Sequence, residues 1–338
     1  MATGKKHRRR AGRERAVLIL CILLFVGAGI YGLYHAIVRP PDINTDPESP
    51  EHDVGQTVPD DTENDEPAEP VFTRKKNYFT ILASGLDDDN GGSDTNILVS
   101  IDAENGVINA VSLPRDTLIN TSWNVKKLNA AYNVGGVERL QQEVSNLLGI
   151  PVDFYITVDL DGFVEVINAI GGIYFDVPID MNYDDPTQDL HIHFQKGYQY
   201  LTGEDALKVV RFRHNNDGTG YGSEDIGRIG TQQAFLTTVA KEMLANLNLS
   251  TLQSYANVFI NYVDTDLSVG NLVWIGTQAM EIGMENIHFY TLPGDGSGSY
   301  QGASYYILYP EEVLALVNSS FNPYEQDLAL EDMDILVP

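Results

Sequence analysis

The stretch VINAVSLPRD, residues Val107–Asp116, decides the fold. Its first seven residues are mostly apolar and rich in β-branched side chains, a pattern that predicts a buried β-strand. Pro114 lacks a backbone N–H and favours an extended conformation in the residue before it, so we expect the strand to end at Leu113. Arg115 and Asp116 then leave the carboxyl end of this strand, where open α/β sheets bind ligands. Because such pairs are also common in structural roles, the other arginines must decide between the two interpretations.

Strand patterns alternate with helical patterns along the rest of the chain. Further strand-like runs are Tyr78–Ser84, Asn96–Asp102, Phe154–Val158, Ile173–Val177 and Ile287–Leu292. Helical patterns cover Val137–Leu148, Gly162–Ile170, Gly203–Val210, Thr231–Leu247, Leu252–Val263 and Val269–Ile282. The short turn 104–106 predicts an antiparallel hairpin. We therefore expect an α/β fold with a central mixed β-sheet covered by helices on both faces.

The amino terminus has the pattern of a membrane anchor. Lys and Arg supply seven of the first fifteen residues, and residues 16–38 are 23 uncharged, mostly apolar residues. At about 1.5 Å per residue, this length spans a hydrocarbon core of about 30 Å. The alternative is a cleaved signal peptide, but the apolar stretch is long for one and no clear cleavage site follows it. The positive-inside rule makes residues 1–15 a cytoplasmic tail of a single-pass cell membrane protein whose main domain is extracellular.

Three segments follow the predicted transmembrane helix. Residues 39–76 are rich in Asp, Glu, Pro and Thr, which predicts a disordered acidic linker. Residues 77–322 are long enough for one large domain or two small ones and form the expected extracytoplasmic domain. Residues 323–338 form a C-terminal tail. The single cysteine, Cys21, lies in the predicted span, so the external part depends on its hydrophobic core rather than on disulfides.

The charge distribution excludes one class of partner. The net charge is −27, although seven of the 21 basic residues lie in the short tail. Such a surface repels nucleic acid, and about fifteen cytoplasmic residues cannot form a DNA-binding domain. After Asn77 the arginines are Arg115, Arg139, Arg211, Arg213 and Arg228. Because four of the five occur in motif-like contexts, they indicate a focused anion site within a repulsive surface.

Arg211 and Arg213 flank Phe212 at the predicted end of a helix. In a continuing helix they would point about 200° apart, but in an extended segment both would project to one side and Phe212 to the other. The alternative is two solvated arginines at a helix C-terminus, where cations are favoured. Planar guanidinium groups suit bidentate contacts with phosphate.

Two aspartates lie at the ends of neighbouring predicted strands. Asp87 ends the first strand, and Asp94 begins the next. Carboxylate oxygens brought together in this way can bind Mg²⁺, which often shares its ligands with a substrate phosphate. The alternative is a simple turn, since the intervening residues have turn composition.

A polar, glycine-rich loop is expected at Asn215–Ser223. It precedes Asp225, Arg228 and a long helix that we expect to open at Thr231. Arg228 and Gln232 are four residues apart and share one face if the helix has already begun at Arg228.

Nine short motifs therefore occur in a fixed order. They are Gly85-x-Asp87, Ser93-Asp94-Thr95, Leu113-Pro114-Arg115-Asp116, Asn129-Ala130-Ala131-Tyr132, Gly135-Gly136, Gly171-Gly172, Gly203-Glu204-x-Ala206-Leu207, Arg211-x-Arg213 and Asp225-x-x-Arg228-x-x-x-Gln232. Together they resemble the LytR-CpsA-Psr family over the motif core 78–247, with a less specific similarity to about Asn318. The short basic tail, single span and spacer are also similar to that family's architecture.

The resemblance implies a phosphotransferase that moves a glycopolymer, such as teichoic acid or capsule, from a polyprenyl-pyrophosphate carrier to peptidoglycan. It also implies an α/β/α sandwich with an apolar cavity for the lipid tail. Carried over by position, Asp87 and Asp94 would hold Mg²⁺. The pyrophosphate would be bound by Arg115, Arg211, Arg213, Arg228 and Gln232. Phosphoryl transfer needs mainly positioning and charge neutralisation, which these groups supply.

The carboxylate that takes the acceptor's proton is Asp225 or Asp116, and the sequence does not choose between them. The chain also departs from the family pattern, since many relatives have arginine where it has Gly92 and Thr231. Two further functions remain open: a hydrolase of the same lipid pyrophosphate, and a non-catalytic module that binds or senses lipid-linked polymer.

Overall fold

The computed structural model describes residues 38–43, 72–87, 92–187, 189–221, 224–246, 255, 258 and 261–338. The predicted cytoplasmic tail 1–15 lies outside these residues. So do nearly all of the predicted transmembrane helix 16–38 and most of the predicted linker 39–76. Within the described part, no helix combines the length and the hydropathy needed to cross a membrane.

A central mixed sheet of six strands organises the described chain, in the order β10-β3-β2-β1-β4-β9. The strands are β1 (Tyr78–Asp87), β2 (Gly92–Asp102), β3 (Val107–Leu113), β4 (Phe154–Val158), β9 (Val263–Thr265) and β10 (Ile287–Thr291). β2 pairs with its neighbours β1 and β3 in antiparallel register, whereas β1 with β4 and β3 with β10 are parallel. The predicted mixed sheet, its hairpin and the end of β3 before Pro114 are therefore confirmed.

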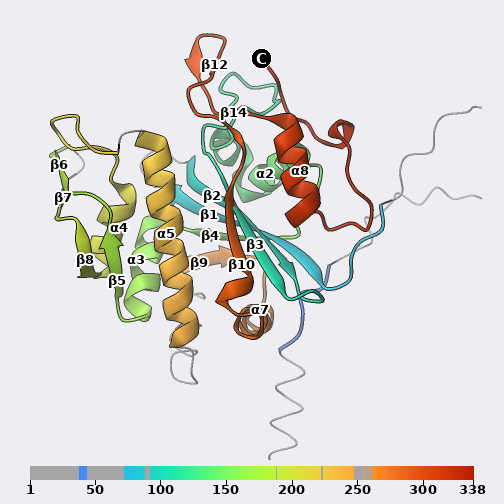
Figure 1. Cartoon of the computed structure of the whole chain (residues 1–338), viewed down its shortest axis with the longest axis horizontal. Coiled ribbons are helices and arrows are strands. Elements are labelled where there is room, and N and C mark those ends of the chain that lie inside the picture. The colour runs from blue at the N-terminus through green and yellow to red at the C-terminus, as the bar shows by residue number, and fades with distance from the viewer. Residues whose placement is uncertain are drawn as a thin grey trace, which may run out of the picture.

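Helices cover both faces of this sheet (Figure 1). Alternate residues of a strand face opposite sides, so Leu98 of β2 joins the core formed with α2 (Ala130–Leu148) and α8 (Pro310–Ser320). Ile101 of the same strand joins the core on the other face, which α7 (Val269–Ile282) covers. The expected α/β/α sandwich is confirmed.

A second core lies beside the sandwich (Figure 1). It is built from α3 (Leu160–Ala169), α4 (Gly203–Arg211), α5 (Glu224–Ala245) and two small antiparallel sheets. One sheet pairs β5 (Ile173–Val177) with β8 (Gly197–Leu201), and the other pairs β6 (Met181–Asp185) with β7 (Leu190–Phe194). Only β5 of these four strands was expected from the sequence.

Close packing of α4 against α3 sets the position of the predicted arginines. A capping box formed by Thr202 and Asp205 starts α4 at Gly203. A Cβ atom on Gly203 would lie 2.3 Å from the carbonyl oxygen of Val164 in α3, so only glycine allows this approach. α4 then carries Arg211 back toward the main sheet.

The chain beyond both predicted domain boundaries also packs on the sandwich. In the segment 72–76, Arg74 Nη2 donates to Asp153 Oδ2 at 2.8 Å. At the other end, Met333 is buried in the core beside α2. A Cβ atom on Gly149, which has a φ of +67°, would lie 2.6 Å from the carbonyl oxygen of Asp332. The packed unit therefore includes residues outside the predicted range 77–322.

Four short strands lie between β10 and α8. Two small pairs, β11 (Gly294–Asp295) with β14 (Ile307–Leu308) and β12 (Ser299–Tyr300) with β13 (Ala303–Ser304), precede α8. The expectation that the long helix opens at Thr231 is wrong, because α5 already begins at Glu224. Most of the predicted helix Leu252–Val263 lies outside the described residues.

Candidate active site

One edge of the main sheet brings the first predicted residues together. β1 ends, β2 begins and β3 ends at this edge, since Gly85 pairs with Thr95 and Asn96 pairs with Leu113. Asp94 therefore lies beside the residues that follow β3, as the predicted exit of Arg115 from that strand requires. The backbone of Asp87 pairs with that of Gly92, two residues from Asp94, although the Asp87 side chain lies outside the described atoms.

Arg115 and Asp94 form an ion pair at this edge. Nη1 of Arg115 lies 2.5 Å from Oδ1 of Asp94, and the two side chains are 26% and 38% exposed. Oδ1 of Asp116 lies 3.7 Å from Nε of Arg115 and 3.2 Å from Nζ of Lys127. The site therefore alternates acidic and basic groups that remain accessible to a ligand.

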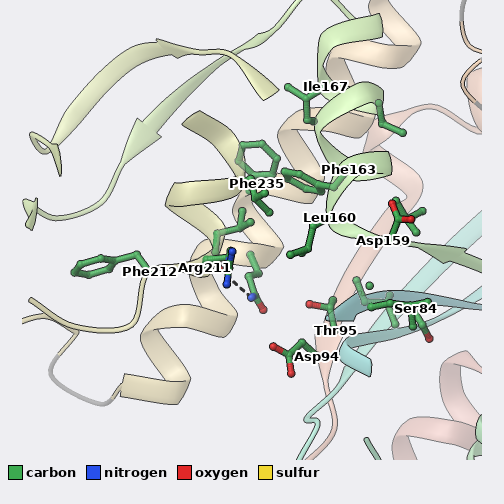
Figure 2. A pocket seen from close by; sticks show the side chains of 18 of the residues that line it. Ser84, Asp94, Thr95, Asp159, Leu160, Phe163, Ile167, Arg211, Phe212 and Phe235 are labelled. Atoms are coloured by element: carbon green, nitrogen blue, oxygen red, sulfur yellow. Dashed lines mark hydrogen bonds between the residues drawn. The ribbon is translucent and has the colours of Figure 1, made fainter. Parts of the chain in front are cut away.

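Arg211 and Arg213 converge on the same place, as the sequence predicts. α4 ends at Arg211, and its C-cap residue Phe212 is extended, with a φ of −61° and a ψ of 134°. Phe212 is buried in the second core, and it lines the cavity described below together with both arginines. Arg213 Nη2 lies 4.0 Å from Oδ2 of Asp94. In Figure 2 the side chains of Phe212 and Arg211 point in different directions.

A cavity of about 510 Å³ opens at this cluster. Its mouth carries Asp94, Arg115, Arg211 and Arg213, and its interior lies between the main sheet, α3, α4 and α5. The interior is lined mainly by apolar side chains, among them Leu160, Phe163, Val166, Ile167, Phe235 and Val239 (Figure 2). A charged mouth above an apolar interior is suited to an amphipathic ligand with an anionic head.

α5 supplies the remaining predicted residues. Because the helix begins before Arg228, the four-residue spacing places Arg228 and Gln232 on one face, as expected. Gln232 lines the cavity, and its Nε2 donates to the carbonyl oxygen of Val210 at 3.2 Å. The side chains of Asp225 and Arg228 lie outside the described atoms. Their predicted roles stay predictions.

The structure adds residues that the motifs do not contain. His214, Tyr183 and Leu190 also line the cavity, and the rings of Tyr183 and His214 meet edge to face at 5.7 Å. His214 adjoins Arg213, but a single histidine in a polar loop gives no signal of its own. Tyr183 and Leu190 come from strands that the sequence pattern did not reveal.

The carboxyl-terminal segment approaches Asp116 from the other side. The backbone N–H of Tyr306 donates to the carbonyl oxygen of Asp116 at 2.9 Å. The hydroxyl of Tyr306 donates to the carbonyl oxygen of Leu292, and burial raises the pKa of Tyr306. Tyr305, beside it, places its ring 5.6 Å from Nζ of Lys127. Both tyrosines therefore help to fix the backbone and the cation next to Asp116.

The two departures from the family pattern occupy different environments. A Cβ atom on Gly92 would lie 3.5 Å from the carbonyl oxygen of Asn129, which is an ordinary contact. Thr231 is 6% exposed, and its Oγ1 lies 2.9 Å from the hydroxyl of Tyr221 and 3.0 Å from the carbonyl oxygen of Gly227. The pKa of Tyr221 is raised, because the effect of burial exceeds that of the hydrogen bond with Thr231, which lowers it.

The chain matches a known protein family over most of its length. The model of the LytR_cpsA_psr family matches residues 51–321. The chain belongs to the LytR-CpsA-Psr family. It is 33% identical over 300 residues to the polyisoprenyl-teichoic acid–peptidoglycan teichoic acid transferase TagV of Bacillus subtilis (strain 168), covering 86% of this chain and 72% of that relative.

Two further LytR-CpsA-Psr proteins extend the comparison. TagU of Bacillus cereus (strain ZK / E33L), which carries the same transferase name, is 30% identical over 298 residues, covering 86% of this chain and 90% of that relative. The crystal structure of Bacillus subtilis TagV has a TM-score of 0.62 at 27% identity, covering 77% of this chain and 98% of that chain. The mixed sheet with flanking helices is thus the family's fold.

Proposed function

We propose that this chain is a cell-envelope transferase that moves a glycopolymer from a polyprenyl-pyrophosphate carrier to peptidoglycan. Two of its relatives are named as transferases that join teichoic acid to peptidoglycan. The observation that carries the proposal is the cavity of about 510 Å³, with an apolar interior and three arginines at its mouth. The interior matches a polyprenyl chain, and the mouth matches the pyrophosphate at its end.

The arginines would bind the pyrophosphate and stabilise charge during transfer. Arg115, Arg211 and Arg213 come from two separate parts of the chain, the exit of β3 and the end of α4. Guanidinium groups arranged around one point can contact several phosphate oxygens at once. Arg228 and Gln232 would extend this set from α5.

The residues at the sheet edge fit a hard divalent cation. Asp94 offers a partly exposed carboxylate. Asp87 of β1 pairs with Gly92 of β2, and Gly92 is two residues from Asp94. The buried hydroxyl of Ser93 has no hydrogen-bond partner in the part of the chain that the structure describes. Mg²⁺ held by Asp87 and Asp94 would neutralise part of the pyrophosphate charge.

The proposed reaction is a phosphoryl transfer. The oxygen of an acceptor hydroxyl attacks the phosphorus that carries the polymer, and the bond from that phosphorus to the bridging oxygen breaks. Polyprenyl phosphate leaves with the bridging oxygen. The hydroxyl proton passes to a carboxylate, Asp116 or Asp225, and comparing the turnover of Asp116→Asn and Asp225→Asn separates these two candidates.

The proposed location follows from the substrate. A lipid-linked donor lies in the membrane and peptidoglycan lies outside it, so the predicted anchor 16–38 would place the folded domain between them. Protease added to intact cells stripped of their wall should remove the domain and spare the basic tail 1–15. Survival of the domain would contradict this topology.

The function is tested by release of polyprenyl phosphate from a synthetic lipid-pyrophosphate-linked sugar, with and without peptidoglycan fragments. Release that requires the acceptor supports the transferase. Release without an acceptor indicates the hydrolase, and binding without release in the unmodified protein indicates the non-catalytic module.

A substitution sharpens the same test. Arg213→Lys keeps the charge but loses the planar two-point contact, so turnover should fall about a hundredfold while affinity changes less. Arg139→Lys is the matched control, since Arg139 pairs with Glu143 and stacks on Trp123 away from the cavity. Equal turnover in Arg213→Lys and the unmodified protein would contradict the assignment.

A further inference from the structure

A group of metal-binding side chains lies on the exposed face of the β6–β7 hairpin, outside the active site. Residues alternate along both strands, so Asn182 and Asp184 of β6 and His191 and His193 of β7 are exposed, while Ile192 is buried. The antiparallel register pairs Asp184 with His191 and Asn182 with His193. The fold thus places two imidazoles and a carboxylate on one face of a two-stranded sheet.

Three ligand atoms converge at this face. Oδ1 of Asp184 lies 2.5 Å from Nδ1 of His191 and 3.2 Å from Nε2 of His193. Each of the three residues offers one atom, and these atoms all lie within 4.8 Å of one another. Two histidine nitrogens and one carboxylate oxygen, with a position left open, are a ligand set of the zinc type. An all-oxygen set, such as the one proposed at Asp87 and Asp94, instead suits Mg²⁺.

The second nitrogen of each ring also faces an oxygen acceptor. Nδ1 of His193 lies 2.7 Å from Oδ1 of Asn182, and Nε2 of His191 lies 3.5 Å from Oδ1 of Asp189. A neutral imidazole has a single N–H, so it cannot donate to acceptors at both of its nitrogens. A shared cation at Asp184 removes this conflict, because each ring can then donate its one proton outward and direct its lone pair inward. Metal-bound histidines commonly have such an outer acceptor.

We propose that Asp184, His191 and His193 bind one divalent transition-metal ion, with Zn²⁺ as the probe. Asn182 and Asp189 act as outer acceptors that orient the two rings. The ion would cross-link the middle of a two-stranded hairpin, a unit that has little stability of its own. This site does not take part in the proposed transferase reaction, so the test of metal binding does not depend on the test of that reaction.

Protons compete with the metal ion for the histidine nitrogens of this site. His191 donates a hydrogen bond to Asp184 when it is protonated at Nδ1, and this bond raises the pKa of His191, as do the nearby charges of Asp184 and Asp189. A metal must displace the proton from each ligating nitrogen, so affinity should fall as the pH is lowered from about 7.5 to about 5.5.

The test is a zinc titration of the purified full chain in detergent with excess Mg²⁺, which occupies hard-cation sites. The unmodified protein should bind one more equivalent of Zn²⁺ than His191→Ala or His193→Ala, and Asp184→Asn should bind it at least about tenfold more weakly. His288→Ala is the matched control, because His288 is an exposed histidine on β10, an edge strand of the main sheet, whereas β6 and β7 form a separate sheet. It should bind zinc like the unmodified protein.

A second measurement keeps the test decisive if a variant folds poorly. Co²⁺ added to the unmodified protein should give visible absorption from a nitrogen-containing site, and Zn²⁺ should abolish it. Equal zinc stoichiometry and affinity in the unmodified protein and both histidine variants would overturn the proposal. So would the absence of the Co²⁺ absorption at saturating metal, which would leave only protons to satisfy the two rings.

Discussion

Nη1 of Arg115 and Oδ1 of Asp94 lie 2.5 Å apart, and this pair joins the end of β3 to the start of β2. The pairing of Asn96 with Leu113 sets the positions of both residues, because Asp94 lies two residues before Asn96 and Arg115 two residues after Leu113. The pair is therefore positioned by backbone hydrogen bonds. It also links the proposed phosphate contact to the proposed metal ligand, so a change in either residue should alter both.

Asp94→Asn is the first prediction. The amide keeps the shape of the side chain but removes the charge that balances Arg115 and that a divalent cation would need. Turnover of the lipid-linked donor should fall about a hundredfold, or about 3 kcal/mol of transition-state stabilisation. The measurement is release of polyprenyl phosphate at saturating Mg²⁺. Asp176→Asn, an exposed aspartate on β5, is the control and should keep full turnover; unchanged turnover in Asp94→Asn would rule out a metal or charge-balancing role.

The second prediction concerns the apolar interior of the cavity. Leu160 lines it from the start of α3 (Figure 2), so Leu160→Trp should fill part of the empty volume. Donors with long polyprenyl chains should bind about tenfold more weakly, while a donor with a short lipid should be little affected. Leu330→Trp, at an exposed position outside the cavity, is the control. An equal loss for long and short donors would show that the cavity does not hold the lipid.

The third prediction uses the position where the family pattern has arginine and this chain has Gly92. Gly92 is buried, but a Cβ atom added there would meet only ordinary contacts, the nearest at 3.5 Å from the carbonyl oxygen of Asn129. Gly92→Arg should therefore fold normally and bind the pyrophosphate donor more tightly, by up to about tenfold or about 1.4 kcal/mol. Direct binding of a non-hydrolysable lipid pyrophosphate measures the change. Weaker binding by a folded Gly92→Arg protein would contradict a role for this edge in phosphate recognition.

The fourth prediction is that arginine is not tolerated at Thr231, the other position where many relatives have arginine. Thr231 is buried and its hydroxyl contacts Tyr221, so Thr231→Arg would bury an unpaired cation and break that contact. The free energy of unfolding should fall by about 3 kcal/mol. Urea denaturation checks this against Ala234→Arg, an exposed position on the same helix. Full stability of Thr231→Arg would mean that the helix can rotate this position toward solvent.

Five of the six strands of the main sheet could be predicted from the sequence, and no described side chain of β1, β2 or β3 is exposed. β9 was missed, because its first residue, Val263, closed a predicted helix. The predicted bounds of Val107–Leu113 and Phe154–Val158 in this sheet are those that the structure has, as are those of Ile173–Val177 in the second core. The convergence of Arg115, Asp94, Arg211 and Arg213 also followed from local rules, since a proline ended β3 and an extended residue ended α4.

The strands of the second core were harder to predict, because each has a polar, exposed face. β6 and β7 contain Asp, Asn and His on their exposed side, so neither shows an apolar run. Because these strands were not predicted, the cavity residues Tyr183 and Leu190 and the group Asp184, His191 and His193 were not predicted either. Composition also misled at the domain boundary. Arg74 lies in a segment that is polar and adjoins the acidic linker, yet its partner Asp153 is 79 residues away and no local pattern reveals that contact.

Arg74→Ala gives the last prediction. The Asp153 carboxylate is only 4% exposed, and its Oδ2 accepts from Arg74 at 2.8 Å and from the backbone N–H of Thr80 at 2.9 Å. Removing the guanidinium leaves a buried carboxylate without its cation, which should lower the free energy of unfolding by about 3 kcal/mol. Lys76→Ala is the matched control, because Lys76 is an exposed cation in the same segment and should change stability by less than about 0.5 kcal/mol. Thermal or urea denaturation of the chain from residue 72 onward measures both. Equal stability of the two variants would show that the contact of the segment 72–76 with the domain does not contribute to the free energy of unfolding.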